Sequence, residues 1–155
     1  MRLQILQRPE GPSMTQAAPF AVDGPLAPPL ARLLAYWEGL KRGQAEVPFW
    51  DDLSEIKIEA SGAETFILDV FSRPERFRFN DLEVAPPAVQ SDLLLGLFLD
   101  DVDLPEVFTL LRAQASATVE LMRPTLYAAG GGQRLLLPAW GEGEVRMLVG
   151  GLAKG

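Results

Sequence analysis

Three carboxylates stand close together in the sequence, at Asp100, Asp101 and Asp103. Clustered carboxylates suit hard cations such as Mg²⁺ and Ca²⁺, which prefer oxygen ligands. No glycine or distal glutamate completes a calcium loop around them, and an aspartate just before a helical pattern commonly caps the first turn. We therefore interpret the cluster as a solvated turn in which Asp103 caps the following helix, and we predict no metal site.

The chain contains no histidine and no cysteine. Without histidine, a serine or threonine nucleophile lacks its usual base, and Lys41, Lys57 and Lys154 stand in contexts that do not favour a serine–lysine pair. Haem held through histidine, flavin photochemistry through a cysteine, and a thioester-linked chromophore each need a side chain that is absent. We predict a protein that is not an enzyme, with no catalytic residue and no cofactor.

Three consecutive glycines at Gly130, Gly131 and Gly132 are the other feature with possible chemistry. A phosphate-binding loop opens a helix and usually carries a lysine, serine or threonine. Here strand-like sequence lies on both sides of the glycines. The pattern therefore favours a hairpin loop over a phosphate site.

Length and charge limit the class of protein. The chain has 155 residues, 48% of them hydrophobic, which is typical of one soluble domain. Its net charge is −7, and a nucleic-acid binder normally needs a basic patch, so we predict no nucleic-acid partner. No apolar run is long enough for a membrane span, and no signal peptide is visible. These observations favour a cytoplasmic protein.

Proline and leucine patterns define the first third of the chain. Residues 1–29 hold six of the 13 prolines and show no sustained apolar period, which predicts a flexible leader before a domain at 30–155. Met14 offers an alternative start. An amphipathic helix is predicted from Pro28-Pro29 to a C-terminal glycine at Gly43. Asp52, with Glu55 three residues on, resembles a capping box for one short helical turn.

Five strand-like segments follow, with helical sequence between the second and the third. The two earlier strands form a predicted hairpin, and the last three are separated by glycine-rich turns. These strands are predicted at residues 65–71, 76–80, 123–127, 133–138 and 145–149. One or two short helices are predicted within 85–98, and a longer one from Leu104, behind the Asp103 cap. The fold class is α+β.

This element order is that of a PAS domain, and local segments strengthen the likeness. Leu34–Gly43 with Val47-Pro48 resembles the opening of a PAS-like family widespread in alphaproteobacteria, whose members begin with a Tyr-Trp helix and then a proline. Arg76-Phe77-Arg78-Phe79 resembles its second strand, and the Leu-Leu-Leu-Pro run ending at Pro138 resembles a closing strand. Asn80 to Leu82 stand where the family often has a glycine.

The resemblance implies a small sensory or interaction module with a five-stranded antiparallel sheet flanked by helices, including the N-terminal amphipathic helix. Members of the family are mostly stand-alone signalling proteins, some of them in cell-cycle or polarity signalling. The chain is accordingly expected to act by binding something else.

Two groups of apolar residues are candidate sites. A ligand pocket between sheet and helices is one candidate, and an ordinary filled core is its alternative. The candidate pocket residues are Phe66, Phe79, Phe98, Phe108 and Met147. The second group, a stripe on the first helix, could serve a dimer or a partner, or pack on its own domain. That stripe consists of Leu30, Leu33, Leu34 and Trp37.

The function expected first is a non-catalytic PAS-like signalling module that acts through protein–protein interaction, either as a homodimer or with another signalling protein such as a kinase. The alternative is a sensor that binds a small apolar metabolite in a pocket between sheet and helices. The two hypotheses differ in whether the core contains a cavity.

Overall fold

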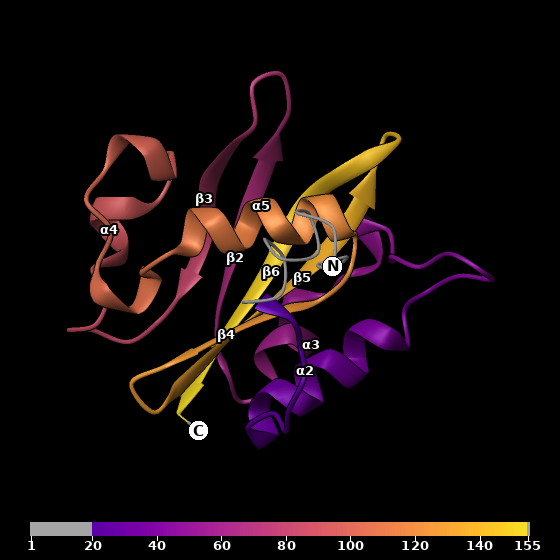
Figure 1. Cartoon of the computed structure of the whole chain (residues 1–155), viewed down its shortest axis with the longest axis horizontal. Helices are drawn as coiled ribbons and strands as arrows, with labels where there is room; N and C mark the ends of the chain where they lie inside the picture. Colours follow the sequence, from indigo (N-terminus) through magenta and orange to yellow (C-terminus); the bar gives the residue numbers. More distant parts are fainter. Residues whose placement is uncertain (1–19, 155) are drawn as a thin grey trace, which may run out of the picture.

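A computed structural model describes residues 20–154, which form a five-stranded antiparallel sheet with helices on both faces (Figure 1). The helices are α2 (Pro28–Glu38), η2 (Trp50–Asp52), α3 (Glu55–Glu59), α4 (Ser91–Leu94), η3 (Leu99–Asp101), η4 (Glu106–Phe108) and α5 (Leu111–Leu121). The strands are β2 (Glu64–Phe71), β3 (Arg76–Glu83), β4 (Thr125–Ala129), β5 (Gly132–Gly141) and β6 (Glu144–Lys154). Their order in the sheet is β3-β2-β6-β5-β4. The predicted α+β class and antiparallel sheet are confirmed.

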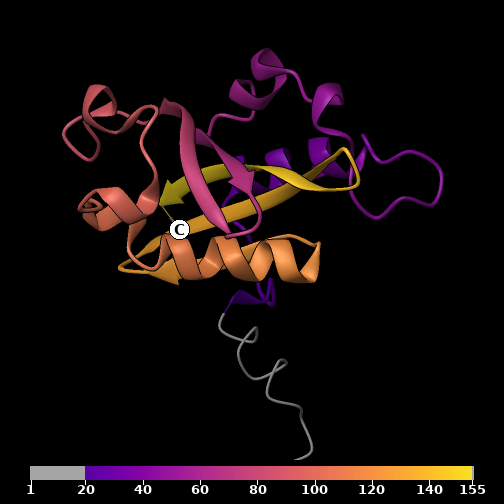
Figure 2. The ribbon, with the colours of Figure 1, turned by 90° about the horizontal axis from the view of Figure 1, so that it is seen from above.

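Two apolar clusters lie on opposite faces of the sheet, because successive side chains of a strand point to opposite sides. In β6, Leu148 packs into the cluster under α5, whereas its neighbour Val149 packs into the cluster under α2. Figure 2 shows α5 on one side of the sheet and α2 and α3 on the other. The core is therefore divided into two layers, one on each face of the sheet.

Helix α2 is fixed to the sheet by its apolar stripe. Pro28 and Pro29 occupy its first turn, where a missing N–H costs nothing, and Trp37 Nε1 donates a hydrogen bond of 2.7 Å to the Pro138 carbonyl. A Cβ at Gly151 would lie 2.8 Å from Leu33 Cδ2, so glycine there permits the close approach of helix and strand. The helix ends at Glu38 and not near Gly43.

Both predicted helix caps are wrong. Asp52 does not cap α3: its carboxylate accepts two hydrogen bonds from Arg42, which lower the pKa of Asp52, and the residue before α3 is Ser54. Asp103 does not cap a long helix either, because the chain forms the short helix η4 first and α5 begins only at Leu111. Leu110 precedes α5 with φ of 60°, a left-handed conformation that interrupts the helix predicted from Leu104.

The predicted leader falls mostly outside the described residues, as does Met14. Its described end, residues 20–27, runs along the sheet. The Phe20 ring lies 6.3 Å from that of Tyr127, and the Gln133 side chain bonds both the Ala27 N–H and the Pro25 carbonyl. This segment is tied to β4 and β5 before α2 begins.

Gly150 in β6 leaves room for the ring of Phe66 on the paired strand β2. An ideal Cβ at this position would overlap the ring, which is itself fully buried. We expect Gly150→Ala to lower the free energy of unfolding by about 2 kcal/mol through overpacking. Urea titration followed by circular dichroism measures this change.

Two companion variants make the Gly150 test specific. Gly24→Ala adds a methyl group where nothing lies within 4 Å and should change stability by less than about 0.5 kcal/mol. Gly150→Ala combined with Phe66→Leu should lose less stability than the sum of the two single variants. Additive losses would show that the ring is not what Gly150 accommodates.

Candidate functional site

The five candidate pocket residues do not come together around one space. Phe108 packs against Phe66 at 5.0 Å and against Phe79 at 5.3 Å between ring centroids, and all three are fully buried. Phe98 is only partly buried, and the Arg76 guanidinium lies over its ring, with 3.8 Å between Arg76 Cζ and the ring centroid of Phe98. Met147 packs on the opposite face of the sheet, with the α2 cluster. Three of the five therefore fill the core under α5.

Two cavities open elsewhere on the described part of the chain. The larger one, about 610 Å³, lies beside the Gly130–Gly132 turn and is lined by charged side chains of both signs, Arg134, Lys154, Glu64 and Glu106 among them. The smaller one, about 500 Å³, lies between α4 and residues 102–105. None of the five predicted pocket residues lines either cavity.

The candidate interface stripe is covered within the chain. Leu30, Leu33 and Trp37 are at most 1% exposed, and they pack with Leu135, Leu137 and Val149 of the sheet. Leu34 is partly buried against the same cluster. Packing onto its own domain, which the sequence left open, is the arrangement found. Because its own sheet covers it, the stripe is not free for a second copy or a partner. A helical period in the sequence shows an apolar face but not what covers that face.

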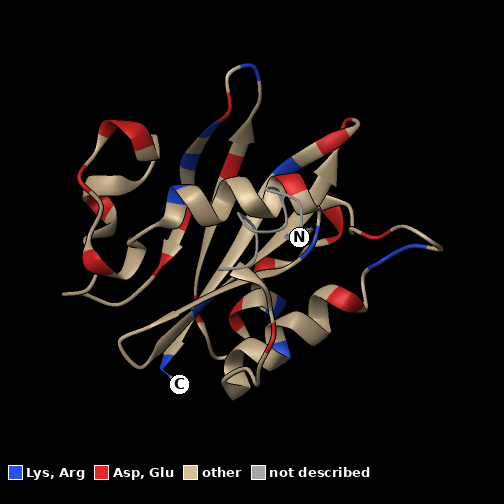
Figure 3. Cartoon of the chain, viewed as in Figure 1, with Lys and Arg blue, Asp and Glu red and all other residues tan. Residues whose placement is uncertain are grey.

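A different surface carries both exposed leucines and charge. Residues 79–111, which we call the acidic segment, run from the second half of β3 through α4, η3 and η4 and contain no lysine or arginine. They carry the acidic residues Asp81, Glu83, Asp92, Asp100, Asp101, Asp103 and Glu106. These seven leave 14 of the chain's 21 acidic residues, which its 14 basic residues balance. The net charge of this segment therefore equals that of the whole chain, −7. Figure 3 shows acidic residues, in red, on the lobe around α4.

Three leucines around α4 are exposed, and one of them, Leu93, lines the smaller cavity. Leu93, Leu95 and Leu97 are 65%, 42% and 41% exposed. Leu93 lines the cavity together with Val102, Leu104 and other apolar residues, and Asp103 stands at the same wall. Exposed apolar groups gathered around a hollow mark interaction surfaces more often than chance exposure does. We therefore take this surface as the candidate functional site.

Backbone pairing fixes the exposed leucines to the edge of the sheet. The Phe79 N–H donates to the Leu97 carbonyl at 3.0 Å, and the Gly96 N–H donates to the Phe79 carbonyl at 2.8 Å. Gly96 has φ of +82°, a conformation that residues with a side chain rarely adopt, so glycine suits this turn. The leucines are thus presented from a defined position on β3.

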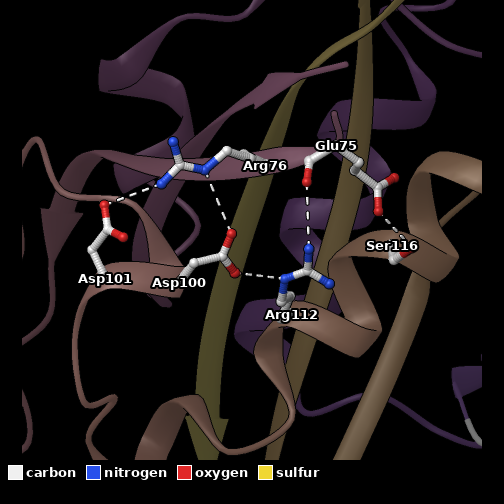
Figure 4. A network of polar contacts seen from close by, with 6 residues as sticks. All are labelled: Glu75, Arg76, Asp100, Asp101, Arg112 and Ser116. Carbon is white, nitrogen blue, oxygen red and sulfur yellow. Dashed lines mark hydrogen bonds and ion pairs between the residues drawn. The ribbon is translucent and has the colours of Figure 1, made fainter. Parts of the chain in front are cut away.

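A polar network anchors the short helix η3, which follows the exposed leucines in the acidic segment (Figure 4). The Asp100 carboxylate accepts a hydrogen bond of 2.7 Å from Arg112 of α5 and forms an ion pair of 3.5 Å with Arg76 of β3. Asp101 pairs with Arg76 at 3.1 Å. The hydrogen bond from Arg112 is the main cause that lowers the pKa of Asp100. Two of the seven carboxylates therefore hold η3 against β3 and α5.

Other carboxylates of the acidic segment lack such partners. Among the residues described, Asp92, Asp103 and Glu106 form no ion pair with a lysine or arginine. Repulsion from Asp81 raises the pKa of Glu83, which reflects the surplus of negative charge. Within residues 20–154 no three carboxylates gather as a metal site would require.

A buried polar cluster lies under α5 and was not predicted from the sequence. The Arg134 side chain is 2% exposed and donates from Nε to Gln114 Oε1, from Nη1 to the Val107 carbonyl and from Nη2 to the Thr109 carbonyl. Burial lowers the pKa of Arg134 to about 10, so it stays charged at neutral pH. It ties the turn before α5 to the sheet.

The distribution of charge along the sequence is a signal that could have pointed to the acidic segment. A run of 33 residues without a basic side chain, between Arg78 and Arg112, is visible in the composition along the chain. That this run contains exposed leucines is visible only in the fold.

No helix among residues 20–154 has both the length and the apolar character needed to cross a membrane. Comparisons of the chain with protein-family models, with curated proteins and with solved structures found no match.

Proposed function

We propose that the chain is a non-catalytic, PAS-like signalling module that works in the cytoplasm through protein–protein interaction, as a homodimer or with another signalling protein such as a kinase. The observation that carries this proposal is the leucine surface of the acidic segment, which consists of the exposed Leu93, Leu95 and Leu97. The backbone beside these leucines is paired with β3, and Leu93 lines a cavity of about 500 Å³.

The element order supports the PAS-like part of the proposal. A helix, two strands, short helices, a longer helix and three strands follow one another as the resemblance implies, and the five strands form one antiparallel sheet. Fold alone does not determine function. The weight of the proposal therefore rests on the surface and not on the architecture.

The alternative, a sensor of a small apolar metabolite, has one observation in its favour. The larger cavity, of about 610 Å³, has the size of a small-molecule site. Its lining includes Arg134 and Lys154 as well as Glu64 and Glu106, which suits an apolar ligand poorly. The space under α5 that the alternative needs is filled by Phe66, Phe79 and Phe108.

Native mass spectrometry of gently purified protein tests the proposed function, because one spectrum reads subunit number and retained small molecules. We expect bare chains, as monomer or dimer, with no added mass. A retained compound of the size of a metabolite, in stoichiometric amount, would overturn the interaction module in favour of the sensor.

A further inference from the structure

We propose that the leucine surface of the acidic segment is the docking site for a basic amphipathic helix of a partner protein. This inference rests on the proposed function and adds the chemistry of the partner. It is carried by three features of the acidic segment: the exposed leucines, the cavity that Leu93 and Asp103 line, and carboxylates that form no ion pair among the described residues.

Charge identifies the partner as basic. Asp92 precedes Leu93 in α4, Asp103 stands at the cavity wall, and Glu106 begins η4. All three are exposed, and none forms an ion pair with a lysine or arginine among residues 20–154. A partner with lysines or arginines around its contact would approach faster and bind in one register, because the two potentials are complementary.

The apolar part identifies the partner as amphipathic. Leu93 stands at a cavity whose other walls include Pro87, Val102 and Leu104, so a leucine-sized side chain of a partner would find apolar contacts there. Ala88 lines both this cavity and the larger one. A helix laid into a groove with apolar anchors on one face is the recognition mode that such a surface fits.

The same charge argues against other occupants. A second copy docked by this surface in a symmetric pair would bring two uncompensated acidic surfaces together, which is repulsive. Anionic lipid headgroups and nucleic-acid phosphates carry the same sign as the surface and would be repelled. A basic segment of another protein is the occupant that complements both the charge and the leucines.

A labelled model peptide tests the proposal directly. The probe is a 14-residue helical peptide with leucines at positions i, i+3, i+4 and i+7 and lysines on its other face, and its binding is measured by fluorescence anisotropy. We expect saturable binding that weakens as salt rises from about 0.05 M to about 0.5 M. A peptide of the same composition in scrambled order and one with glutamate for lysine should not bind.

Three triple variants test which side chains bind the peptide. The first two separate the carboxylates of the acidic segment from net charge in general, and the third tests the leucines. Asp92→Asn/Asp103→Asn/Glu106→Gln should weaken peptide binding by about tenfold, since each exposed pair contributes a fraction of a kcal/mol. Asp23→Asn/Glu46→Gln/Glu120→Gln removes as many exposed charges elsewhere and should bind as the unaltered chain does. Leu93→Gln/Leu95→Gln/Leu97→Gln should abolish binding, with circular dichroism confirming that each variant is folded.

The outcomes distinguish this inference from the proposed function. No binding of the basic peptide, or equal weakening by both charge variants, would overturn the docking of a basic helix. The interaction module would survive that result if native spectra still showed bare protein. A retained metabolite in those spectra would overturn the proposed function whatever the peptide does.

Discussion

Phe108→Ala is expected to lower the free energy of unfolding by about 4 kcal/mol. Phe108 is fully buried and joins Phe66 of β2 to Phe79 of β3 through ring contacts of 5.0 and 5.3 Å. Removing the ring forfeits its transfer from water and leaves a cavity at the centre of the layer under α5. Urea titration at neutral pH measures the loss.

A matched variant shows whether the loss comes from burial. Ile56→Ala removes a large side chain that is 81% exposed, and should change the free energy of unfolding by less than about 0.5 kcal/mol. If Phe108→Ala were equally harmless, the layer under α5 would not be tightly filled. The candidate pocket around Phe66, Phe79 and Phe108 would then return to consideration.

Arg134→Met is expected to lower the free energy of unfolding by about 3 kcal/mol. The change leaves the buried Gln114 Oε1 without its donor, which costs stability, and it removes the part-buried hydrogen bonds to the carbonyls of Val107 and Thr109. Loss of the buried charge offsets part of this, because burying a guanidinium is itself unfavourable. Thermal or urea unfolding gives the net value.

A second substitution separates charge from geometry at this position. Arg134→Lys keeps the positive charge but lacks the planar fork that reaches three acceptors at once, so we expect a loss close to that of Arg134→Met. Stability equal to that of the unaltered chain in both variants would mean that the cluster does not hold the turn before α5. The sheet itself should persist, since β5 keeps its backbone pairing with β4 and β6.

The sheet was the part most readily predicted from sequence. Alternating residues at Arg76 to Asn80 and the glycines at 130–132 and 141–143 are local signals, and strands with turns appear at each of them. The first helix starts at Pro28, as predicted, but the starts of the helices expected after Asp52 and Asp103 were predicted less well. Asp52 and Asp103 look like caps by type, yet one is bound by Arg42 and the other precedes a turn into a separate short helix. Tertiary partners decide such positions.

The candidate sites show the limit of reasoning from residue type. A stripe such as Leu30, Leu33 and Trp37 is the same in sequence whether its own sheet or another protein covers it, and here its own sheet does. Leu93, by contrast, stands at helical spacing from Val89 and Leu97, which predicts a buried face, yet it is 65% exposed. Helix α4 ends at Leu94, and directly after it Gly96 and Leu97 pair with β3, a contact between distant parts of the sequence. Local pattern does not encode such pairing.

Site-specific photo-crosslinking in the cells that produce the protein tests the central claim most directly. A benzophenone amino acid is placed at position 93, on the leucine surface, and in a second variant at position 56, which is more exposed but lies on α3. We predict discrete crosslinked protein bands from position 93 that are absent from position 56, with the mass of the band identifying the partner. No crosslinked protein from position 93, or the same bands from both positions, would contradict the account.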